Sequence, residues 1–150
     1  MSEPVATMAD HGFGLARLGH EECLRLLSGA SLGRVAVNLP GSPPVIRPVN
    51  YTFDGPSLSV AFRCAAGSKL HALTHADRAA FEVDGEEGSG ASGWSVIVVG
   101  PVEEVSEAAD LARLARATVR PWLTGAQAPR WLRIRATAIS GRRIGATTRR

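Results

Sequence analysis

The stretch RCAAGSKL at residues 63–70 contains the one lysine of the chain, although the chain carries 17 lysine and arginine residues in all. A helical turn that opens at Ser68 would direct unpaired backbone N–H groups and the positive end of its dipole outward. Gly67 would let the backbone approach a ligand closely, and the compact ammonium of Lys69 suits a single phosphate oxygen better than a planar guanidinium does. These three residues are therefore predicted to bind a phosphate group; a capped surface helix with a solvated lysine is the alternative.

No other group of residues has the spacing of a catalytic or metal site. The chain has no suggestive pair of carboxylates and no Ser-His-Asp or Cys-His set, so hydrolysis and acyl transfer have no support. His71 and His75 are four apart and could share a helical face, but no third ligand is evident, so structural or solvated roles are expected and no metal is predicted. Cys23 and Cys64 have no paired spacing and are expected to be buried thiols.

The elements that must position these residues are mostly strands. Valine, isoleucine and aromatic residues concentrate in six segments that turn-forming residues separate, and these predict a small antiparallel β-barrel with two or three helices. Leu58, Val60 and Phe62 are expected on one strand face, and Asp-Gly at 54–55 predicts a hairpin. Residues 94–99 are apolar on both faces, which predicts a barrel interior on one side and a subunit interface or a helix on the other. The six segments are residues 31–39, 43–53, 57–62, 78–84, 93–105 and 130–139.

Two amphipathic helices are expected between these strands. One begins near His20, buries Cys23, Leu26 and Leu27, and ends at Gly29. The other runs from about residue 106 to 119, with Ser106 as its N-cap, and is expected to bury Leu111, Leu114 and Ala115.

Composition indicates one globular domain. The chain has 150 residues, of which 45% are hydrophobic, and we divide it into a mobile arm at 1–17, a domain at 18–144 and a tail at 145–150. No apolar run is long enough for a bilayer and the N-terminus is acidic, so a cytoplasmic protein with no membrane partner is expected. The formal charge is only +3, and nucleic-acid binding by the arginines of residues 130–150 ranks last among the functions considered.

The succession GRVAV, VIRPVNYTFDG, SLSVAFRCAAGSKLHAL, AAFEVD, GWSVIVVGPVEEV and WLRIRATAISGRRI resembles the pyridoxamine 5′-phosphate oxidase-like family of flavin-binding proteins. It is most similar to the short actinobacterial members related to nitroimidazole reductases. The resemblance covers residues 18–144, and PVNY and GSKL are its most specific pieces. It implies a mainly β fold, a six-stranded antiparallel split β-barrel, usually as a homodimer whose flavin lies in a groove shared by both subunits.

The resemblance also implies the site. The strand Arg47, Pro48, Val49, Asn50 and Tyr51 is expected to run along the isoalloxazine ring, with the backbone of Val49 and Asn50 and the hydroxyl of Tyr51 as candidate donors to its polar edge. The turn Gly67, Ser68, Lys69 is expected to hold the phosphate. Trp94 and Trp131 are expected near the flavin, from the neighbouring subunit; a core or interface position is the alternative. The true oxidases carry an Arg-x-x-x-x-Lys strand, and Arg47 has no such lysine after it, which argues against vitamin B6 oxidase activity.

The resulting functional hypothesis is an FMN-dependent oxidoreductase that transfers a hydride or electrons to a small molecule. No catalytic side chain is assigned, because the cofactor would carry the chemistry. The alternatives are a deazaflavin-dependent reductase of the same fold, and a flavin- or haem-binding protein that turns nothing over.

Overall fold

The computed structural model describes residues 14–65, 71–88, 92–119 and 130–145, and most of them lie in β-strands. The mainly β fold expected from the sequence is confirmed. In chain order the elements are β1 (Gly14–Arg17), α1 (His20–Gly29), β2 (Leu32–Val37), β3 (Val45–Asp54), β4 (Ser59–Cys64), the 3₁₀ turn η1 (His71–His75), β5 (Ala79–Glu87), β6 (Ser92–Gly100), β7 (Val102–Glu104), α2 (Ala108–Leu114), β8 (Arg130–Arg135) and β9 (Ala138–Gly145).

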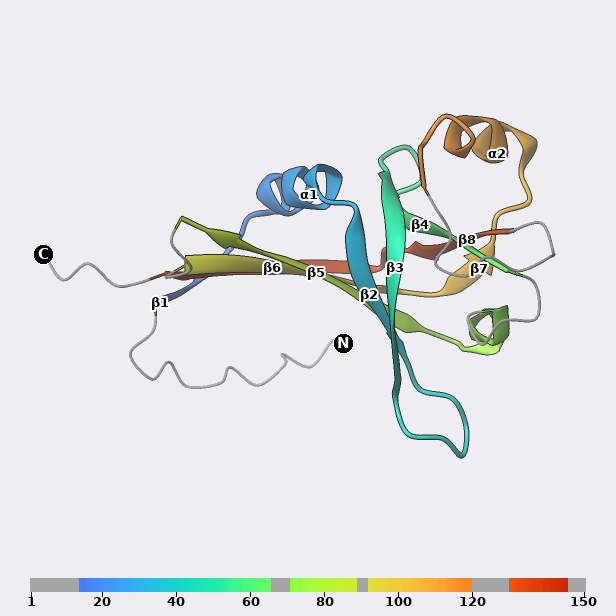
Figure 1. Ribbon diagram of the computed structural model, residues 1–150, viewed down its shortest axis with the longest axis horizontal. Helices are drawn as coiled ribbons and strands as arrows, with labels where there is room; N and C mark the ends of the chain where they lie inside the picture. Colours follow the sequence, from blue (N-terminus) through green and yellow to red (C-terminus); the bar gives the residue numbers. More distant parts are fainter. Residues whose placement is uncertain (1–13, 66–70, 89–91, 120–129, 146–150) are drawn as a thin grey trace, which may run out of the picture.

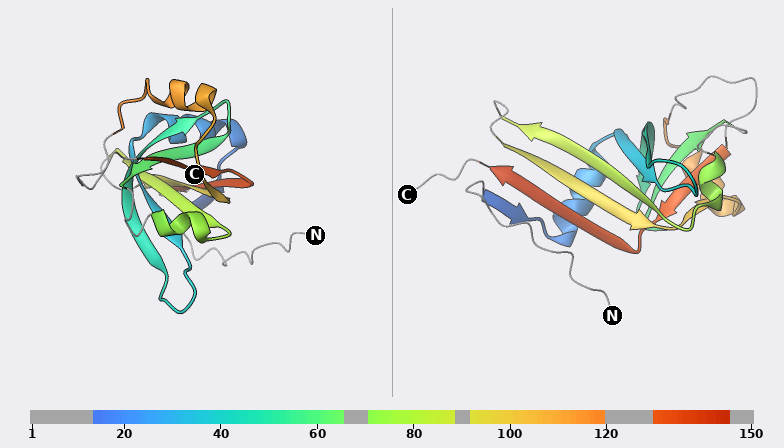
Figure 2. Two further views of the ribbon diagram at one scale, coloured as in Figure 1. Left: turned by 90° about the vertical axis from the view of Figure 1, so that its right-hand side faces the viewer. Right: turned by 90° about the horizontal axis from the view of Figure 1, so that it is seen from below.

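All strands join one antiparallel sheet in the order β1-β9-β6-β5-β2-β3-β4-β8-β7, which curls into a split barrel (Figures 1 and 2). The six expected segments become more strands because two of them change sheet partners midway. The segment 93–105 breaks at Gly100-Pro101 into β6 and β7, and the segment 130–139 breaks at Ala136-Thr137 into β8 and β9. Residues 14–17, which the sequence assigns to the arm, form β1 on the edge of β9.

The core lies between α1 and the concave face of the sheet (Figure 1). Helix α1 has the predicted bounds and buries Cys23, Leu26 and Leu27. Both cysteines are buried, as expected, and burial raises the pKa of the Cys23 thiol. None of the helices in the described part of the chain is long and apolar enough to cross a bilayer.

Helix α2 is shorter than predicted. It runs from Ala108 to Leu114, its N-cap is Glu107 rather than Ser106, and no side chain caps it. The backbone N–H groups of Arg116 and Ala117 bond three residues back, which tightens the last turn and ends the helix. The apolar period that predicted a longer helix buries Leu114 and leaves Ala115 exposed, so tertiary contacts rather than the period set the helix end.

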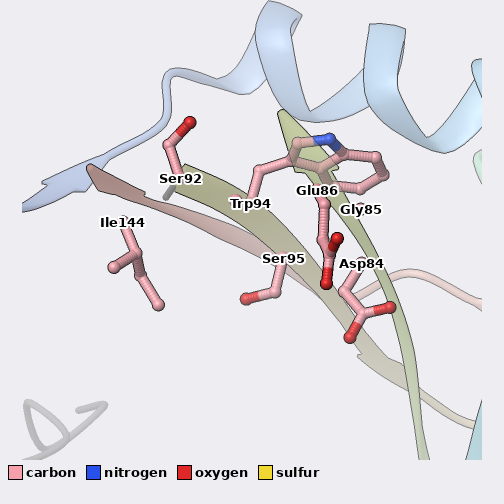
Figure 3. Close-up of a pocket in the computed structure, with 8 residues that line it drawn as sticks. Asp84, Gly85, Glu86, Ser92, Trp94, Ser95 and Ile144 are labelled. Atoms are coloured by element: carbon pink, nitrogen blue, oxygen red, sulfur yellow. The ribbon is translucent and has the colours of Figure 1, made fainter. Parts of the chain in front are cut away.

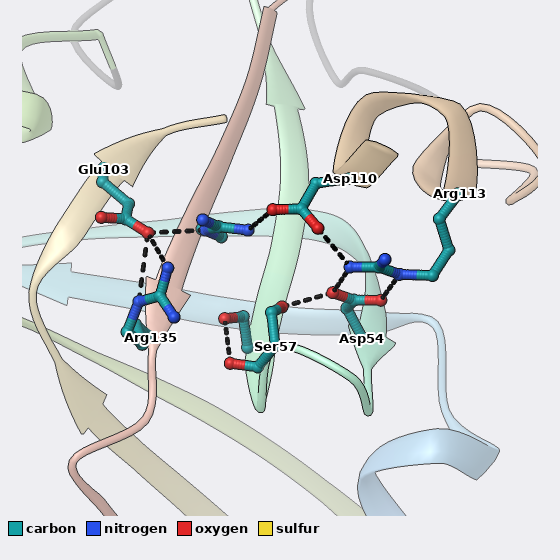
Figure 4. A network of polar contacts seen from close by, with 8 residues as sticks. Asp54, Ser57, Glu103, Asp110, Arg113 and Arg135 are labelled. Atoms are coloured by element: carbon teal, nitrogen blue, oxygen red, sulfur yellow. Dashed lines mark hydrogen bonds and ion pairs between the residues drawn. The ribbon is translucent and has the colours of Figure 1, made fainter. Parts of the chain in front are cut away.

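A chain of alternating charges fixes α2 to the sheet (Figure 4). Arg113 of α2 holds both carboxylate oxygens of the buried Asp54, at 2.7 and 2.8 Å, and also reaches Asp110 at 2.7 Å. These guanidinium contacts lower the pKa of Asp54. Asp110 in turn accepts from Arg133 of β8 at 2.7 Å, and this contact lowers the pKa of Asp110. Both carboxylates are therefore ionised at neutral pH, and the network continues through Glu103 to Arg135.

One strand prediction is wrong in detail. Leu58 does not share a strand face with Val60 and Phe62, because it lies in the β3–β4 turn with a φ of 50° and is 36% exposed. The hairpin that Asp54-Gly55 predicted is present, closed by the Leu58 N–H donating to the Gly55 carbonyl at 3.0 Å. Val60 and Phe62 are fully buried.

Candidate functional site

The middle of β3 is the point where the strand changes neighbours. On one side β3 pairs with β2 over Val45–Asn50. On the other side it pairs with β4 over Tyr51–Asp54 only. Among the described residues no strand therefore pairs with the β4-side edge of β3 over residues 45–49, and we call this the open edge. A planar ligand with hydrogen-bonding groups along one side can lie there in place of a strand.

Strand alternation decides which peptide groups point to the open edge. The Tyr51 N–H donates to the Ser31 carbonyl at 2.9 Å, so Tyr51, and with it Val49 two residues back, directs its peptide groups toward β2. Asn50 directs its peptide groups toward β4, where the β3–β4 ladder begins, and Pro48 directs only a carbonyl toward the open edge. The peptide N–H of Val49 is therefore used in the ladder opposite Gly33 and cannot be the ring donor that was expected.

The hydroxyl of Tyr51 is also engaged. It donates to the Leu27 carbonyl at 2.6 Å inside the core, and the Tyr51 ring makes an edge contact with Phe81 at 4.6 Å between centroids. Burial raises the pKa of Tyr51. This hydroxyl has no hydrogen left to donate to a ligand, so Tyr51 can contribute only its position beside the site.

A small pocket of about 200 Å³ lies at the end of the open edge, next to Asn50, and its lining includes Ser31, Asn50, Tyr51 and Thr118. Ser31 and Thr118 come from the chain just before β2 and just after α2. Sequence reasoning missed both, because neither lies near Asn50 in the chain. The volume is below the roughly 300–1,000 Å³ of pockets that enclose a whole small-molecule ligand, so a ligand of nucleotide size would need a further wall.

Of the other residues expected on β3, Arg47 and Pro48 lie along the open edge. The Arg47 guanidinium donates to the Ile46 carbonyl at 2.9 Å, and Pro48 is exposed. Asn50 and Asp54 lie on the same outward face of β3. Asp54 is bound by Arg113 and therefore lies under α2, whereas Pro48 on this face is exposed. Asn50 lies between the exposed part and the covered part.

Trp131 lies two strands from β3, on the face of β8 that α2 covers. It packs beside Ala61 and Leu114, and its ring lies 5.6 Å from the guanidinium carbon of Arg63 on β4. Within the described chain, Arg63 Nε is the one buried side-chain nitrogen or oxygen without a hydrogen-bond partner. Sequence reasoning did not single out Arg63, although a charged residue between the buried Phe62 and Cys64 was a signal that could have found it.

Trp94 is not brought to this site within one chain, because β6 lies three strands from β3. Its indole covers Gly85, where a Cβ would lie 2.8 Å from the ring. Beside it is an open hollow of about 390 Å³ (Figure 3), whose lining includes Asp84, Glu86 and Ile144. Trp94 therefore helps build a second region, distant from the open edge.

The turn Gly67, Ser68 and Lys69 lies outside the described residues. The backbone of His71–His75 is a 3₁₀ turn, in which positions three apart rather than four share a face. The sequence had assumed an α-helical turn here. In the parts of the chain that the structure describes, no three His, Cys, Asp or Glu residues are grouped to hold a metal ion.

The sheet face opposite the core exposes large apolar side chains. Cross-strand pairing puts them on one side, since Leu15 lies opposite Ile144 and Leu32 opposite Asn50. Helix α1 lies on the other side of the sheet (Figure 1). We call this surface the outer face; its exposed apolar residues are Leu15 at 44%, Leu32 at 42%, Ile46 at 61%, Ile97 at 39% and Ile144 at 47%.

Comparison with known proteins gives consistent matches along the chain. The sequence model of a family described as pyridoxamine 5′-phosphate oxidase matches residues 19–143. The uncharacterized protein Rv0080 of Mycobacterium tuberculosis is 31% identical over 138 residues, which are 90% of this chain and 89% of that protein. The solved structure of the FAD binding protein from Mycobacterium smegmatis is 34% identical, with a TM-score of 0.73 over 87% of this chain and 98% of that one. A FAD-binding protein from Mesorhizobium loti is 25% identical, with a TM-score of 0.72 over 89% and 99% of the two chains.

Proposed function

The chain belongs to the pyridoxamine 5′-phosphate oxidase family, and from this premise we propose that it binds a flavin nucleotide and works as an oxidoreductase on a small molecule. The observation that carries the proposal is the open edge of β3, with the pocket of Ser31, Asn50 and Thr118 beside it. Two similar solved structures are those of FAD-binding proteins. FAD therefore joins FMN and deazaflavin as a candidate.

The residues present fit such a ligand. A flavin ring has carbonyl and N–H groups along one side, and the Pro48 carbonyl faces that way along the open edge. Arg63 on the neighbouring strand β4 has no ion pair among the described residues, and its guanidinium offers a cationic group to an anionic part of the ligand. When bound, the flavin would supply hydride or electron transfer. The chain itself would orient the ring and keep water from one side of it.

A second copy of the chain is proposed to complete the site. The pocket beside Asn50 is small for a nucleotide, and the outer face leaves Ile46 and Ile97 exposed at 61% and 39%. The outer face also carries positive and negative side chains, and Arg34 contacts Asp84 there at 3.0 Å. A second copy related by two-fold symmetry could therefore offer groups of complementary charge. Burying this face in a homodimer would cover the apolar residues and bring a further wall toward the open edge.

The proposed dimer can be tested by a substitution on the outer face. Replacing Ile97 with arginine is expected to give a monomer, because a buried unpaired charge in the interface costs several kcal/mol. Light scattering at micromolar protein concentration measures the mass. The control Ala112→Arg adds the same charge on the exposed side of α2 and should leave a dimer. A wild-type protein that is monomeric under these conditions would contradict the proposal.

The function itself is tested by the absorption spectrum of freshly purified protein, followed by titration with FMN, FAD and deazaflavin. We expect a flavin spectrum, or uptake of one flavin per chain, and turnover of a nicotinamide donor with an electron acceptor. A deazaflavin band would favour the reductase alternative, while a bound flavin or haem without turnover would favour a carrier. A colourless protein that takes up none of these cofactors would overturn the proposal.

A further inference from the structure

Arg63 and Trp131 form a fixed pair on the face of the sheet that α2 covers. They are cross-strand partners on β4 and β8, and the guanidinium carbon lies 5.6 Å from the centroid of the Trp131 ring. A cation within about 6 Å of an indole face is attracted to it. Trp131 itself is held by Ala61 and Leu114. The positive charge of Arg63 is therefore held in place by packing rather than by a carboxylate.

A neighbouring arginine shows how unusual this is. Arg133 lies on the same face, two positions along β8, and contacts Glu103 at 2.6 Å and Asp110 at 2.7 Å. Of the ion pairs between described residues, none includes Arg63. Its Nε is also buried without any hydrogen-bond partner. A ligand cannot reach this shielded Nε, so a partner from outside these residues would bind the terminal nitrogens of the guanidinium.

The position of Arg63 connects it to the open edge. The β3–β4 ladder begins with Tyr51 opposite Phe62, and continuing this register by one position sets Arg63 opposite Asn50. Directly opposite residues of an antiparallel pair project on the same face. Since Asn50 lines the small pocket, the charge of Arg63 lies one strand away from the ligand site, at a spacing of about 4.8 Å between strands.

We propose that Arg63 binds the phosphate of the flavin nucleotide through the terminal nitrogens of its guanidinium, while Trp131 holds the guanidinium in orientation. An anion is favoured over a neutral ring carbonyl because the guanidinium has no counter-ion among the described residues, and its planar fork matches phosphate oxygens. FMN and FAD both offer this group, and riboflavin lacks it. The inference rests on the proposed function and adds to it a residue that distinguishes phosphorylated from unphosphorylated flavin.

The test compares the affinities of wild-type protein and Arg63→Gln for FMN, FAD and riboflavin, measured by calorimetry. Loss of a charge-assisted hydrogen bond should raise the Kd for at least one phosphorylated flavin by about tenfold or more. The Kd for riboflavin should change less than about twofold, since a shift of RT ln 2 is near 0.4 kcal/mol. Arg25→Gln is the matched control, because Arg25 is exposed on α1 and contacts Glu22; it should change none of the three.

The other outcomes are equally decisive. Equal weakening of FMN and riboflavin would mean that Arg63 contacts the ring or supports the fold, and unchanged FMN and FAD affinities would mean that it contacts no phosphate; either result overturns the inference. If Arg63→Gln does not fold by circular dichroism, Arg63→Lys keeps the charge without the fork and should still lower the preference of the protein for FMN over riboflavin; an unchanged preference would overturn the inference.

Failure of the proposed function can be told apart from failure of this inference. If the wild-type protein binds no flavin, pyrophosphate alone is added and the melting temperature is measured. If pyrophosphate raises the melting temperature of the wild type but not of Arg63→Gln, Arg63 binds an anion although the flavin proposal is wrong. No stabilisation of either protein would remove both.

Discussion

Replacing Lys69 with alanine is expected to raise the Kd for the phosphorylated flavin at least about tenfold. A charge-assisted hydrogen bond to a phosphate contributes about 1.5–3 kcal/mol, and each 1.4 kcal/mol is a factor of ten in affinity. In the sequence, the one lysine among 17 lysine and arginine residues directly follows Gly67-Ser68. Calorimetric titration with FMN and FAD measures the effect.

Lys69→Arg is the matched variant for this experiment. It keeps the charge but replaces a compact ammonium with a planar fork, so the Kd is expected to fall between those of the wild type and Lys69→Ala. Riboflavin affinity and the melting temperature should stay the same in both variants. A titration of Lys69→Ala that matches the wild type with both nucleotides would show that this lysine has no part in binding.

Replacing Gly100 with alanine is expected to destabilise the fold by about 3 kcal/mol or more, at the upper end of overpacking effects. A Cβ at this position would lie 1.7 Å from the backbone oxygen of Arg135. Backbone atoms cannot move aside as a flexible side chain does. Gly100 lies where β6 passes into β7, beside the passage of β8 into β9, and bonds from Arg135 and Thr137 to Pro101 and Val99 tie the two crossings together. Urea unfolding measures the loss.

The control for this substitution is Gly29→Ala. Gly29 ends α1, and a Cβ there would meet nothing within 4 Å. Alanine is the better helix former by about 1 kcal/mol in a helix interior, so the stability of this variant should equal or exceed that of the wild type. If Gly100→Ala were as stable as Gly29→Ala, the close crossing of the two corners would be wrong.

The binding predictions for Lys69 and for Arg63 can be tested separately. Lys69 was chosen from the sequence, and Arg63 from contacts across the sheet. If both bind phosphate, each variant should lose the preference for FMN over riboflavin. If only one does, the other variant keeps that preference, and the phosphate position is assigned to a single side of the site.

Much of the fold could be predicted from the sequence because its signals are local. The apolar face of α1 and its stop at Gly29 depend on residues within three turns. The hairpin after β3 depends on the neighbours Asp54 and Gly55. Alternation in Val60 and Phe62 likewise needs only adjacent residues. These predictions are confirmed, as is the mainly β class.

The candidate site was predicted less well, because its chemistry depends on pairing between distant strands. The choice of Val49 and the Tyr51 hydroxyl as donors did not hold, since pairing with Gly33 and Leu27 uses those groups. The end of α2 and the breaks at Gly100 and Ala136 were missed for the same kind of reason, as sheet partners change there.

By itself the sequence determined the strand segments, the first helix and the resemblance to a flavin-binding family, because propensity, alternation and motif order lie within the chain. The tertiary structure decided which edge of β3 is open, and that Arg63 packs on Trp131 without an ion pair to any described residue. Arg63 and Trp131 are far apart in the sequence but adjacent across β4 and β8, and Arg133 rather than Arg63 receives both nearby carboxylates. Counter-ions and edge partners are set by long-range pairing, and no local pattern encodes them.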